Sequence, residues 1–195
     1  MLSAFLILAG YLLGSVPTGL LAGRAYGVDV RRVGSGNIGM ANVLRAAGKP
    51  AAAITMLGDM LKGLVPVLAA RLLVDNDWVV AAVALAALAG HCWPVFLRFK
   101  GGKGVATGAG TTIALAPVVG LALFAVWWGV VFLSRYTSLG AIVTMVAGPV
   151  AFLLTGQPVP YVLYTFVGSA LVLWRHRENA RALLRGTERK IGEKV

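Results

Sequence analysis

The sequence predicts an all-α, polytopic membrane protein with about seven transmembrane helices, N-terminus out and C-terminus in. Of the 195 residues, 58% are hydrophobic and only 13% are charged, whereas a soluble domain carries about 25% charged residues. Apolar stretches near the roughly 20 residues that a membrane helix needs recur along the chain. The Lys and Arg residues of the loops fall on alternate connections, as the positive-inside rule requires. We therefore expect residues 1–195 to form one integral membrane domain.

The apolar stretches place the helices in order along the chain. We expect helices at about residues 3–23, 51–73, 78–97, 105–116, 118–134, 138–155 and 160–175. The first is interpreted as a retained helix rather than a cleaved signal, because no basic segment precedes its apolar run. Residues 105–134 are too long for one untilted span and contain Pro117. One kinked helix is possible there, and a short pair turning at Ala116-Pro117 is the alternative.

Charge decides between these two arrangements. With the short pair, one side of the membrane receives the basic segments 24–50, 98–104, 135–137 and 176–195. The other side receives the N-terminus and the segments around 75–77, 117 and 156–158, which contain no Lys or Arg. A single kinked helix would move Arg135 to the poor side and place the basic tail outside, so we predict the pair. The net charge of +11 suits anionic lipid headgroups or an anionic substrate. Nucleic acid is disfavoured, because the cations are divided among loops.

The loop at residues 98–104 reads Arg-Phe-Lys-Gly-Gly-Lys-Gly and is the strongest signal for a binding site. Gly101, Gly102 and Gly104 allow backbone N–H groups to turn toward an anion, and Lys103 supplies a mobile positive charge. A Walker A loop is excluded, because it requires Ser or Thr where Gly104 follows Lys103. Glycines on both sides of a lysine favour anion binding over mere contact with the membrane surface.

A second polar segment runs from Gly34 to Arg45 and reads Gly-Ser-Gly-Asn-Ile-Gly-Met-Ala-Asn-Val-Leu-Arg. Its first residues favour a loop, and a short helix is expected from Ala41. Ser35 or Asn37 could simply cap that helix, but a helix N-terminus also binds phosphate. The run offers more polar residues than a cap needs, so we favour phosphate binding, with Arg45 nearby.

Ionisable residues inside the predicted spans have two interpretations. Asp59 and Lys62 lie three residues apart, so they can share one helix face and form a structural ion pair. Such residues also mark functional sites, and the sequence leaves both interpretations open. His91 is more often a hydrogen-bonded core residue than a catalytic one. The small residues of Gly14-Ser15-Val16-Pro17-Thr18 favour close helix packing.

The inner end of the chain supplies further candidates. Ser138 precedes an apolar run and is first a helix cap, although it could also contact substrate. His176 and Asn179 lie three residues apart on one helix face, and we favour function over a plain surface helix for this pair. Cys92 is a single cysteine, which excludes an intramolecular disulfide. The sequence has no metal-binding spacing and no nucleophile elbow, so the expected chemistry uses no metal, cofactor or protein nucleophile.

Taken together, these segments resemble the bacterial acyl-phosphate:glycerol-3-phosphate acyltransferases over nearly the whole chain. The matching motifs are Gly14-Ser-Val-Pro-Thr18, Gly34-Ser-Gly-Asn37 through Arg45, Asp59-x-x-Lys-Gly63, Gly90-His91, Phe99-Lys-Gly-Gly-Lys-Gly104 with Thr107, Ser138-Leu-Gly140 and His176-Arg-Glu-Asn179. One departure is visible, since the family usually has Ala-Thr-Asn where this chain has Met40-Ala41-Asn42.

The resemblance implies a reaction and a location. The 1-hydroxyl of glycerol-3-phosphate would attack an acyl phosphate directly, giving 1-acylglycerol-3-phosphate (lysophosphatidate) and phosphate, the first step of phospholipid synthesis. The enzyme would lie in the bacterial inner membrane among membrane lipids, with its site facing the cytoplasm and no cofactor. The residues it places in catalysis are Ser35, Lys103, His176 and Asn179. Those it places in substrate binding are Gly34, Gly36, Asn37, Arg45, Gly101, Gly102, Gly104, Thr107 and Ser138.

Two questions stay open at this stage. The proton of the attacking hydroxyl could be accepted by His176 or by a substrate phosphate. A membrane transporter for a phosphorylated metabolite or lipid is the alternative function, which Asp59, Lys62 and Pro117 would suit. The one-sided distribution of the polar motifs argues against a transporter. The sequence does not indicate the acyl-chain preference or the oligomeric state.

Overall fold

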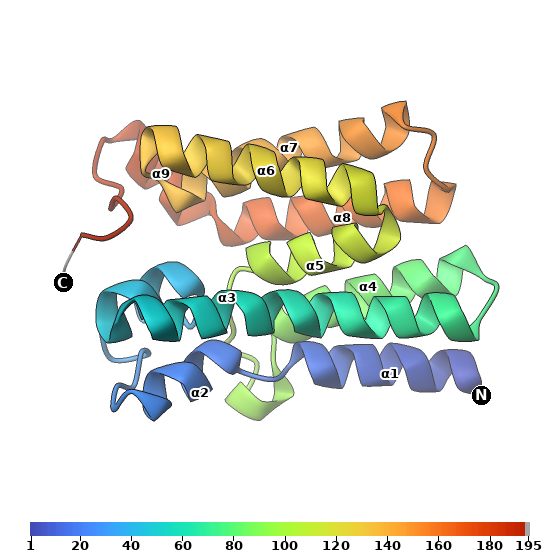
Figure 1. The fold of residues 1–195 in the computed structure, drawn as a ribbon, viewed down its shortest axis with the longest axis horizontal. Coiled ribbons are helices and arrows are strands. Elements are labelled where there is room, and N and C mark those ends of the chain that lie inside the picture. Colours follow the sequence, from blue (N-terminus) through green and yellow to red (C-terminus); the bar gives the residue numbers. More distant parts are fainter. Residues whose placement is uncertain (194–195) are drawn as a thin grey trace.

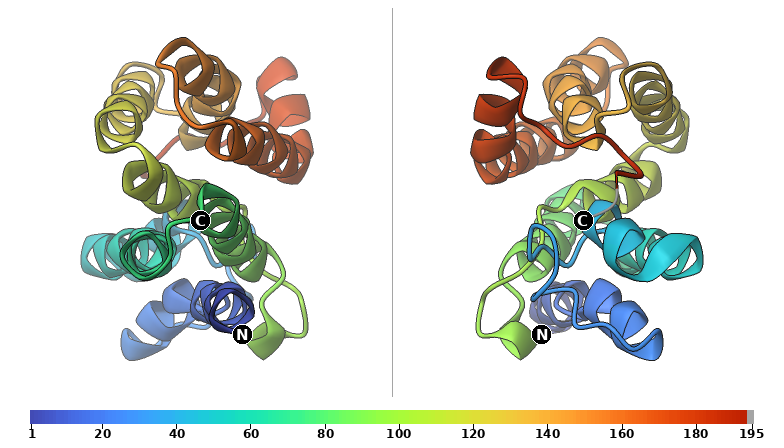
Figure 2. Two further views of the ribbon diagram at one scale, coloured as in Figure 1. Left: turned by 90° about the vertical axis from the view of Figure 1, so that its right-hand side faces the viewer. Right: turned by 90° about the vertical axis from the view of Figure 1, so that its left-hand side faces the viewer.

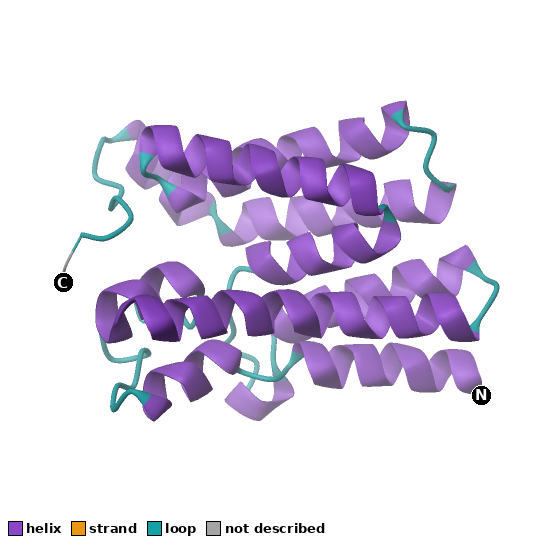
Figure 3. Cartoon of the chain, viewed as in Figure 1, coloured by secondary structure: helices purple, strands orange, loops and turns teal. Residues whose placement is uncertain are grey.

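The computed structural model describes residues 1–193, and all of the regular secondary structure in that range is helical (Figures 1 and 3). The helices are α1 (Leu2–Gly14), α2 (Thr18–Ala25), α3 (Met40–Leu73), α4 (Asp77–Cys92), the short 3-10 helix η1 (Val95–Leu97), α5 (Val105–Leu115), α6 (Pro117–Ser134), α7 (Thr137–Leu154), α8 (Val159–Arg175) and α9 (Arg177–Leu184).

The long helices run along one common axis, with the described N-terminus at one end and the tail after α9 at the other (Figure 1). The end views show α1, α3 and α4 in one group and α6, α7 and α8 in another, with α5 between them (Figure 2). Five segments of residues 1–193 are long and apolar enough to cross a membrane, and α5 and α8 are shorter apolar helices. The prediction of an all-α, polytopic membrane fold is confirmed, and the orientation remains a prediction.

The first predicted helix, 3–23, is interrupted, and this part of the prediction is wrong. Helix α1 ends at Gly14, and α2 begins at Thr18. Pro17 has no N–H to continue the helical ladder. The carbonyl of Val16 accepts a hydrogen bond of 3.0 Å from the N–H of Thr18 and one of 2.8 Å from Lys62 Nζ. A side chain at Gly14 would collide with the backbone of Ala87 on α4. The small residues here therefore do serve close helix packing.

The third predicted helix, 78–97, ends earlier than expected. Helix α4 stops at Cys92, and Trp93 has non-helical backbone angles (φ −132°, ψ 68°). The residue before a proline is pushed out of the helical region, and Pro94 follows. After η1 the chain turns through Arg98 and Phe99, whose φ values are 51° and 62°. As a result, the loop between α4 and α5 lies part way along the molecule rather than at its end (Figure 1).

The other elements follow the predictions closely. Helix α3 contains the predicted short helix and the predicted span, joined by a kink at Gly48 with φ 85°. The chain turns between α5 and α6 at Ala116, where Pro117 occupies the first turn of α6. The short pair is therefore confirmed against the single kinked helix. Helices α7 and α8 begin within one residue of their predicted starts.

Candidate active site

A cavity of about 330 Å³ lies between the two groups of helices. Its polar end, here called the mouth, is formed by loops and helix ends. The mouth is lined by Ser35, Asn37, Arg45, Lys103, Ser138, His176, Asn179 and Glu188. The apolar part of the cavity, here called the groove, runs between α5, α6, α7 and α8. Its lining includes Gly108, Thr112, Gly120, Leu123, Trp127, Thr144, Met145, Gly148, Tyr164, Thr165 and Ser169.

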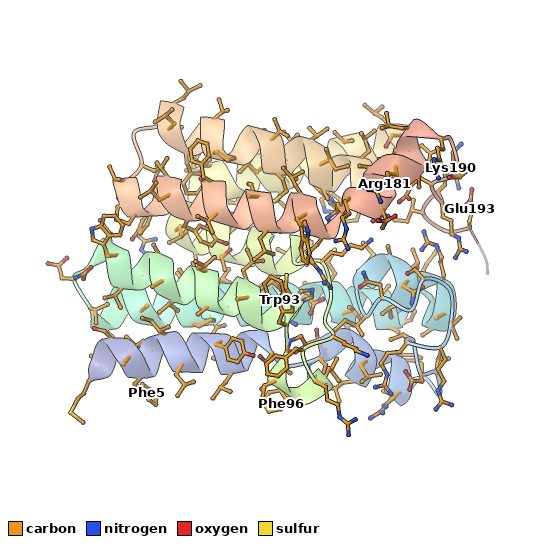
Figure 4. All side chains as sticks on the ribbon, turned by 180° about the vertical axis from the view of Figure 1, so that it is seen from behind. Phe5, Trp93, Phe96, Arg181, Lys190 and Glu193 are labelled. Carbon is orange, nitrogen blue, oxygen red and sulfur yellow. The ribbon has the colours of Figure 1, made fainter. Side chains whose placement is uncertain are left out.

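Figure 4 shows the side chains from the side opposite to Figure 1, with Arg181, Lys190 and Glu193 gathered at the same end of the molecule. This is the end at which α9 and the tail lie.

The loop before α3 is shaped there by the buried side chain of Asn42. Its amide nitrogen donates to the carbonyls of Val30, Val33 and Asn37 at 2.9, 3.1 and 2.9 Å, and its oxygen accepts from the backbone N–H of Ser35 at 3.0 Å. One amide thus satisfies four backbone groups of a loop that has no regular structure of its own, and it fixes Ser35 at the mouth.

The Gly-Gly-Lys-Gly loop is held by Arg175 at the end of α8. The guanidinium donates to the carbonyls of Gly101 and Gly102 at 2.8 and 2.9 Å, and Gly102 N–H donates to the carbonyl of His91 at 3.1 Å. A side chain at Gly102 would collide with the ring of His91. These two glycines therefore allow a close approach between loop and helix. Lys103, the next residue of the loop, lines the cavity.

A chain of hydrogen bonds links the mouth residues from separate elements. Lys103 Nζ donates to Asn179 Oδ1, and Asn179 Nδ2 donates to Glu188 Oε1 at 2.7 Å. Ser138 Oγ donates to the same carboxylate oxygen at 2.6 Å. Glu188 lies in the tail after α9, so the tail folds back to complete the site. Asn179 and Ser138 are thereby oriented by a carboxylate rather than by each other.

The mouth carries more positive charge than its own carboxylate neutralises. Burial is the main cause that lowers the pKa of Lys103; Glu188 opposes this, and the charges of Arg175 and Arg45 add to it. Burial likewise lowers the pKa of Arg45. Arg45 Nε is buried without a hydrogen-bond partner in residues 1–193, and its Nη2 only reaches the carbonyls of Arg189 and Lys190 at 3.5 Å. Crowded cations with an unused donor favour binding of an anion.

His176 caps the end of α8 and is only 4% exposed. Its Nδ1 lies 2.8 Å from the carbonyl of Val172. A carbonyl can only accept, so Nδ1 carries the proton and Nε2 keeps its lone pair in the neutral ring. Burial lowers the pKa of His176 to about 4, an effect that the Val172 bond opposes and the charge of Lys103 reinforces. The imidazole is therefore neutral at pH 7 and can accept a hydrogen bond.

A second group of charges lies beneath the loop, in the spans. Lys62 Nζ is 2.7 Å from Asp59 Oδ1, and Thr18 on α2 also donates to this carboxylate. His91 Nδ1 lies 3.6 Å from the same oxygen, which is too long for a hydrogen bond. Asp59 and His91 border the cavity, whereas Lys62 turns toward the break between α1 and α2. The ion pair predicted from the spacing is present, and it ties α3 to the interrupted first helix.

The structure brings most of the predicted site residues together. Those that line the cavity are Ser35, Asn37, Arg45, Lys103, Gly104, Ser138, His176 and Asn179. Gly34, Gly36, Gly101, Gly102 and Thr107 lie outside its lining. Thr107 is fully buried behind the cavity on α5. The main residue that the sequence prediction omitted is Glu188, whose only signal was its place in a basic tail.

The fold and cavity define a polytopic, all-helical membrane protein with a cationic mouth above an apolar groove. A model of the glycerol-3-phosphate acyltransferase family matches residues 4–186. A glycerol-3-phosphate acyltransferase from Rubrobacter xylanophilus is 76% identical over 192 residues, which cover 98% of this chain and 96% of the relative. One from a strain of Thermus thermophilus is 48% identical and covers 97% and 95%. The chain therefore belongs to the glycerol-3-phosphate acyltransferase family and is an acyltransferase.

Solved structures agree with this assignment. The crystal structure of PlsY, an integral membrane glycerol 3-phosphate acyltransferase, in its glycerol 3-phosphate form is similar to this chain with a TM-score of 0.93 and 41% identity. The match covers 98% of this chain and 96% of PlsY. The lysophosphatidic acid form of PlsY gives a TM-score of 0.91 at 40% identity.

Proposed function

We propose that this protein transfers an acyl group from an acyl phosphate to the 1-hydroxyl of glycerol-3-phosphate. The products are 1-acylglycerol-3-phosphate and inorganic phosphate. The observation that carries the proposal is the juxtaposition of the mouth and the groove. The mouth offers Lys103 and Arg45 to phosphate groups, and the groove offers apolar walls to an acyl chain. A substrate that joins a phosphate to an acyl chain matches both parts at once.

Direct attack, without an acyl-enzyme, suits the residues at the mouth. An acyl phosphate is a mixed anhydride and is already activated, so the enzyme needs to position two anionic substrates and stabilise developing charge. Lys103, Arg45 and the Ser35 hydroxyl supply cations and a donor for this task. The cysteine of the chain, Cys92, is fully buried in α4 and stands outside the cavity lining. It is therefore a poor candidate for a nucleophile.

Two groups compete as the acceptor of the hydroxyl proton. His176 presents an unprotonated Nε2 in its neutral form, and Val172 holds the ring in place. However, a base whose pKa is lowered to about 4 is a weak one. A phosphate dianion, with a second pKa of about 6 by analogy with phosphoserine, is more basic. We therefore assign proton acceptance to a substrate phosphate and positioning of the glycerol hydroxyl to His176.

The cavity does not favour the alternative of a transporter. Beyond the groove, Phe152, Leu115 and Val119 belong to one buried core cluster. A transport path needs access from both faces at the level of the site, and this cluster fills the far side.

The decisive experiment uses purified protein with hexadecanoyl phosphate and glycerol-3-phosphate. We expect release of inorganic phosphate together with hexadecanoyl glycerol-3-phosphate, in equal amounts, and only when both substrates are present. The same assay with hexadecanoyl-CoA tests the donor, and we expect no product. Product formation from the CoA ester alone would contradict the acyl phosphate donor. Phosphate release without acylated product would contradict the transfer.

The proposal includes an orientation, with the mouth facing the cytoplasm of a bacterial inner membrane. It rests on the Lys and Arg residues of segments 24–50, 98–104, 135–137 and 176–195, of which Arg181 and Lys190 lie at the mouth end of the molecule (Figure 4). Replacing Cys92 by Ala leaves a background without cysteine for single-cysteine labelling. An impermeant maleimide added to intact cells should label Cys placed at Asn76 and should not label Cys placed at Lys190. The reverse pattern would invert the topology.

A further inference from the structure

The groove ends inside the protein instead of opening at the far membrane face. Along α7 its lining residues run from Ser138 at the mouth to Gly148, ten residues or about 15 Å at 1.5 Å per residue. Along α6 the lining reaches Gly120. Beyond these residues, Phe152, Val119 and Leu115 are buried and belong to one core cluster. A chain entering from the mouth therefore meets a floor formed by this cluster.

The polar side chains of the groove do not interrupt its apolar character. Thr112, Thr144 and Thr165 each donate their hydroxyl hydrogen to a carbonyl of their own helix, at 2.9, 2.9 and 2.7 Å. The methyl groups of these threonines are then left to line the wall of the groove. Trp127 Nε1 is the exception, since it is buried without a partner in the described part of the chain. Because these hydroxyls already have hydrogen-bond partners, none is left unpaired when an alkyl chain lies against them.

Two glycines in the groove wall are not explained by helix packing. A Cβ at Gly110 or Gly120 would collide with the backbone of a neighbouring helix, which explains their lack of a side chain. A Cβ at Gly108 would meet nothing nearer than Leu88 Cδ1 at 4.0 Å, and a Cβ at Gly148 nothing nearer than Leu123 Cδ1 at 3.8 Å. Both are buried and both line the cavity. A larger side chain there would enter the cavity, not the neighbouring helix.

We propose that Gly108 and Gly148 set the length of the acyl chain that the enzyme accepts, because each leaves the groove open beside its own helix. This inference rests on the proposed function, because it takes the groove as the acyl site. Gly108 lines the groove from α5 and Gly148 lines it from α7. A side chain added at either position should block acyl chains long enough to reach it.

The test measures kcat/KM of the unchanged protein, Gly148→Leu and Gly108→Leu with octanoyl, dodecanoyl and hexadecanoyl phosphate. In Gly148→Leu the ratio for hexadecanoyl over octanoyl phosphate should fall at least about tenfold, since one misfitting methylene in an apolar pocket changes the rate constant by about 10–200-fold. In Gly108→Leu the same ratio should fall. Replacing helical glycine favours the helix, so both variants should fold, which thermal unfolding in detergent checks.

Gly129→Leu is the matched control. Gly129 lies on the exposed face of α6, and a Cβ there meets nothing within 4 Å. Its chain-length profile should equal that of the unchanged protein. Turnover with unaltered profiles in both groove variants would overturn the inference and leave the proposed function standing. Absence of turnover with every acyl phosphate in the unchanged protein would overturn the proposed function, and this inference with it.

Discussion

Two groups of charged residues, one buried and one half-buried, border the same region of this protein and are built in opposite ways. Around Asp59 and Lys62, each charge meets its opposite at 2.7 Å, and Thr18 and the Val16 carbonyl satisfy the remaining positions. At the mouth, Lys103 contacts a neutral amide, and Arg45 has an unused buried donor. Within residues 1–193, the one carboxylate that lines the mouth, Glu188, bonds to Ser138 and Asn179. Burying an unpaired charge costs several kcal/mol. The Asp59–Lys62 group thus pairs its charges without a ligand, and the mouth does not.

The comparison predicts that the largest effect on stability follows loss of the Asp59–Lys62 ion pair. Asp59→Ala leaves Lys62 buried and unpaired, which should destabilise the protein by about 3–5 kcal/mol. Denaturation in detergent micelles measures this. The double variant Asp59→Leu with Lys62→Met removes both charges and should recover most of the stability. If Asp59→Ala unfolds like the unchanged protein but has lost its activity, the pair belongs to the site, and the contrast between the two groups fails.

Lys103→Ala should act on turnover rather than on stability. A loop lysine has little packing to lose, but its contact with a phosphate is charge-assisted and contributes roughly 1.5–3 kcal/mol, about tenfold to more than a hundredfold in kcat/KM. Lys100→Ala is the control, because Lys100 is an exposed lysine three residues away that stands outside the cavity. Near-normal turnover in Lys103→Ala would assign the loop to membrane contact alone.

Arg45→Lys sharpens the comparison, because it keeps the positive charge and removes the paired N–H donors of the guanidinium. A guanidinium can hold a phosphate with two parallel hydrogen bonds, whereas an ammonium acts as a point charge. We expect the KM for glycerol-3-phosphate to rise roughly threefold to tenfold, the effect of one hydrogen bond. Arg32→Lys, on the exposed surface of the same loop region, should leave KM unchanged. An unaltered KM in Arg45→Lys would show that charge alone matters.

The acid limb of the pH–rate profile separates the two proton acceptors. The pKa of His176 is lowered to about 4, so this ring stays neutral until the pH falls to that value. A limb centred near about 6 would then belong to a substrate phosphate. It should persist in His176→Asn, which is expected to be slow, because His176 then only positions the hydroxyl. Disappearance of the limb near about 6 in His176→Asn would restore His176 as the base.

The alkaline limb reports on the mouth itself. Burial lowers the pKa of Lys103 from the ordinary lysine value of 10.5, so Lys103 loses its charge at a lower pH than an exposed lysine does. Binding of glycerol-3-phosphate should weaken as the pH rises through that lowered value. Isothermal titration calorimetry across the alkaline range measures the effect. A pH dependence that is identical in Lys103→Ala would assign it to another group.

The helices and the grouping of the site were predictable because they depend on local signals. The turn at Ala116-Pro117 followed from where Arg135 had to lie, and the segments around Ser35, Lys103 and His176 each carry polar residues that an apolar span does not need. The early end of α4 had a signal in Pro94, but the apolar residues after it continue the hydropathy of a helix. Proline is also tolerated inside membrane helices, so the sequence alone did not decide the outcome.

The features that sequence reasoning missed depend on contacts between distant segments. Glu188 accepts a hydrogen bond from Ser138, which lies 50 positions earlier in the sequence. No local pattern around Glu188 indicates that the tail folds back. Gly101 and Gly102 are typical of an anion-binding loop, yet their carbonyls face Arg175, which lies 74 and 73 positions later. The break at Pro17 is likewise stabilised by Lys62 from another helix. Local patterns do not reveal which distant partner a backbone group will find.

The break between α1 and α2 at Pro17 also bears on how the chain assembles in the bilayer. Helix α1 has 13 residues, about 20 Å at 1.5 Å per residue, and is too short to cross a hydrocarbon core of about 30 Å alone. Residues 2–25 together are long enough to cross, so we expect α1 and α2 to enter the membrane as one unit that is already interrupted at Pro17. The carbonyl of Val16 accepts from the N–H of Thr18 at 3.0 Å within that unit. Lys62 adds a second, charge-assisted bond to the same carbonyl once α3 has inserted, so helix association fixes the angle of a break that local bonds already allow.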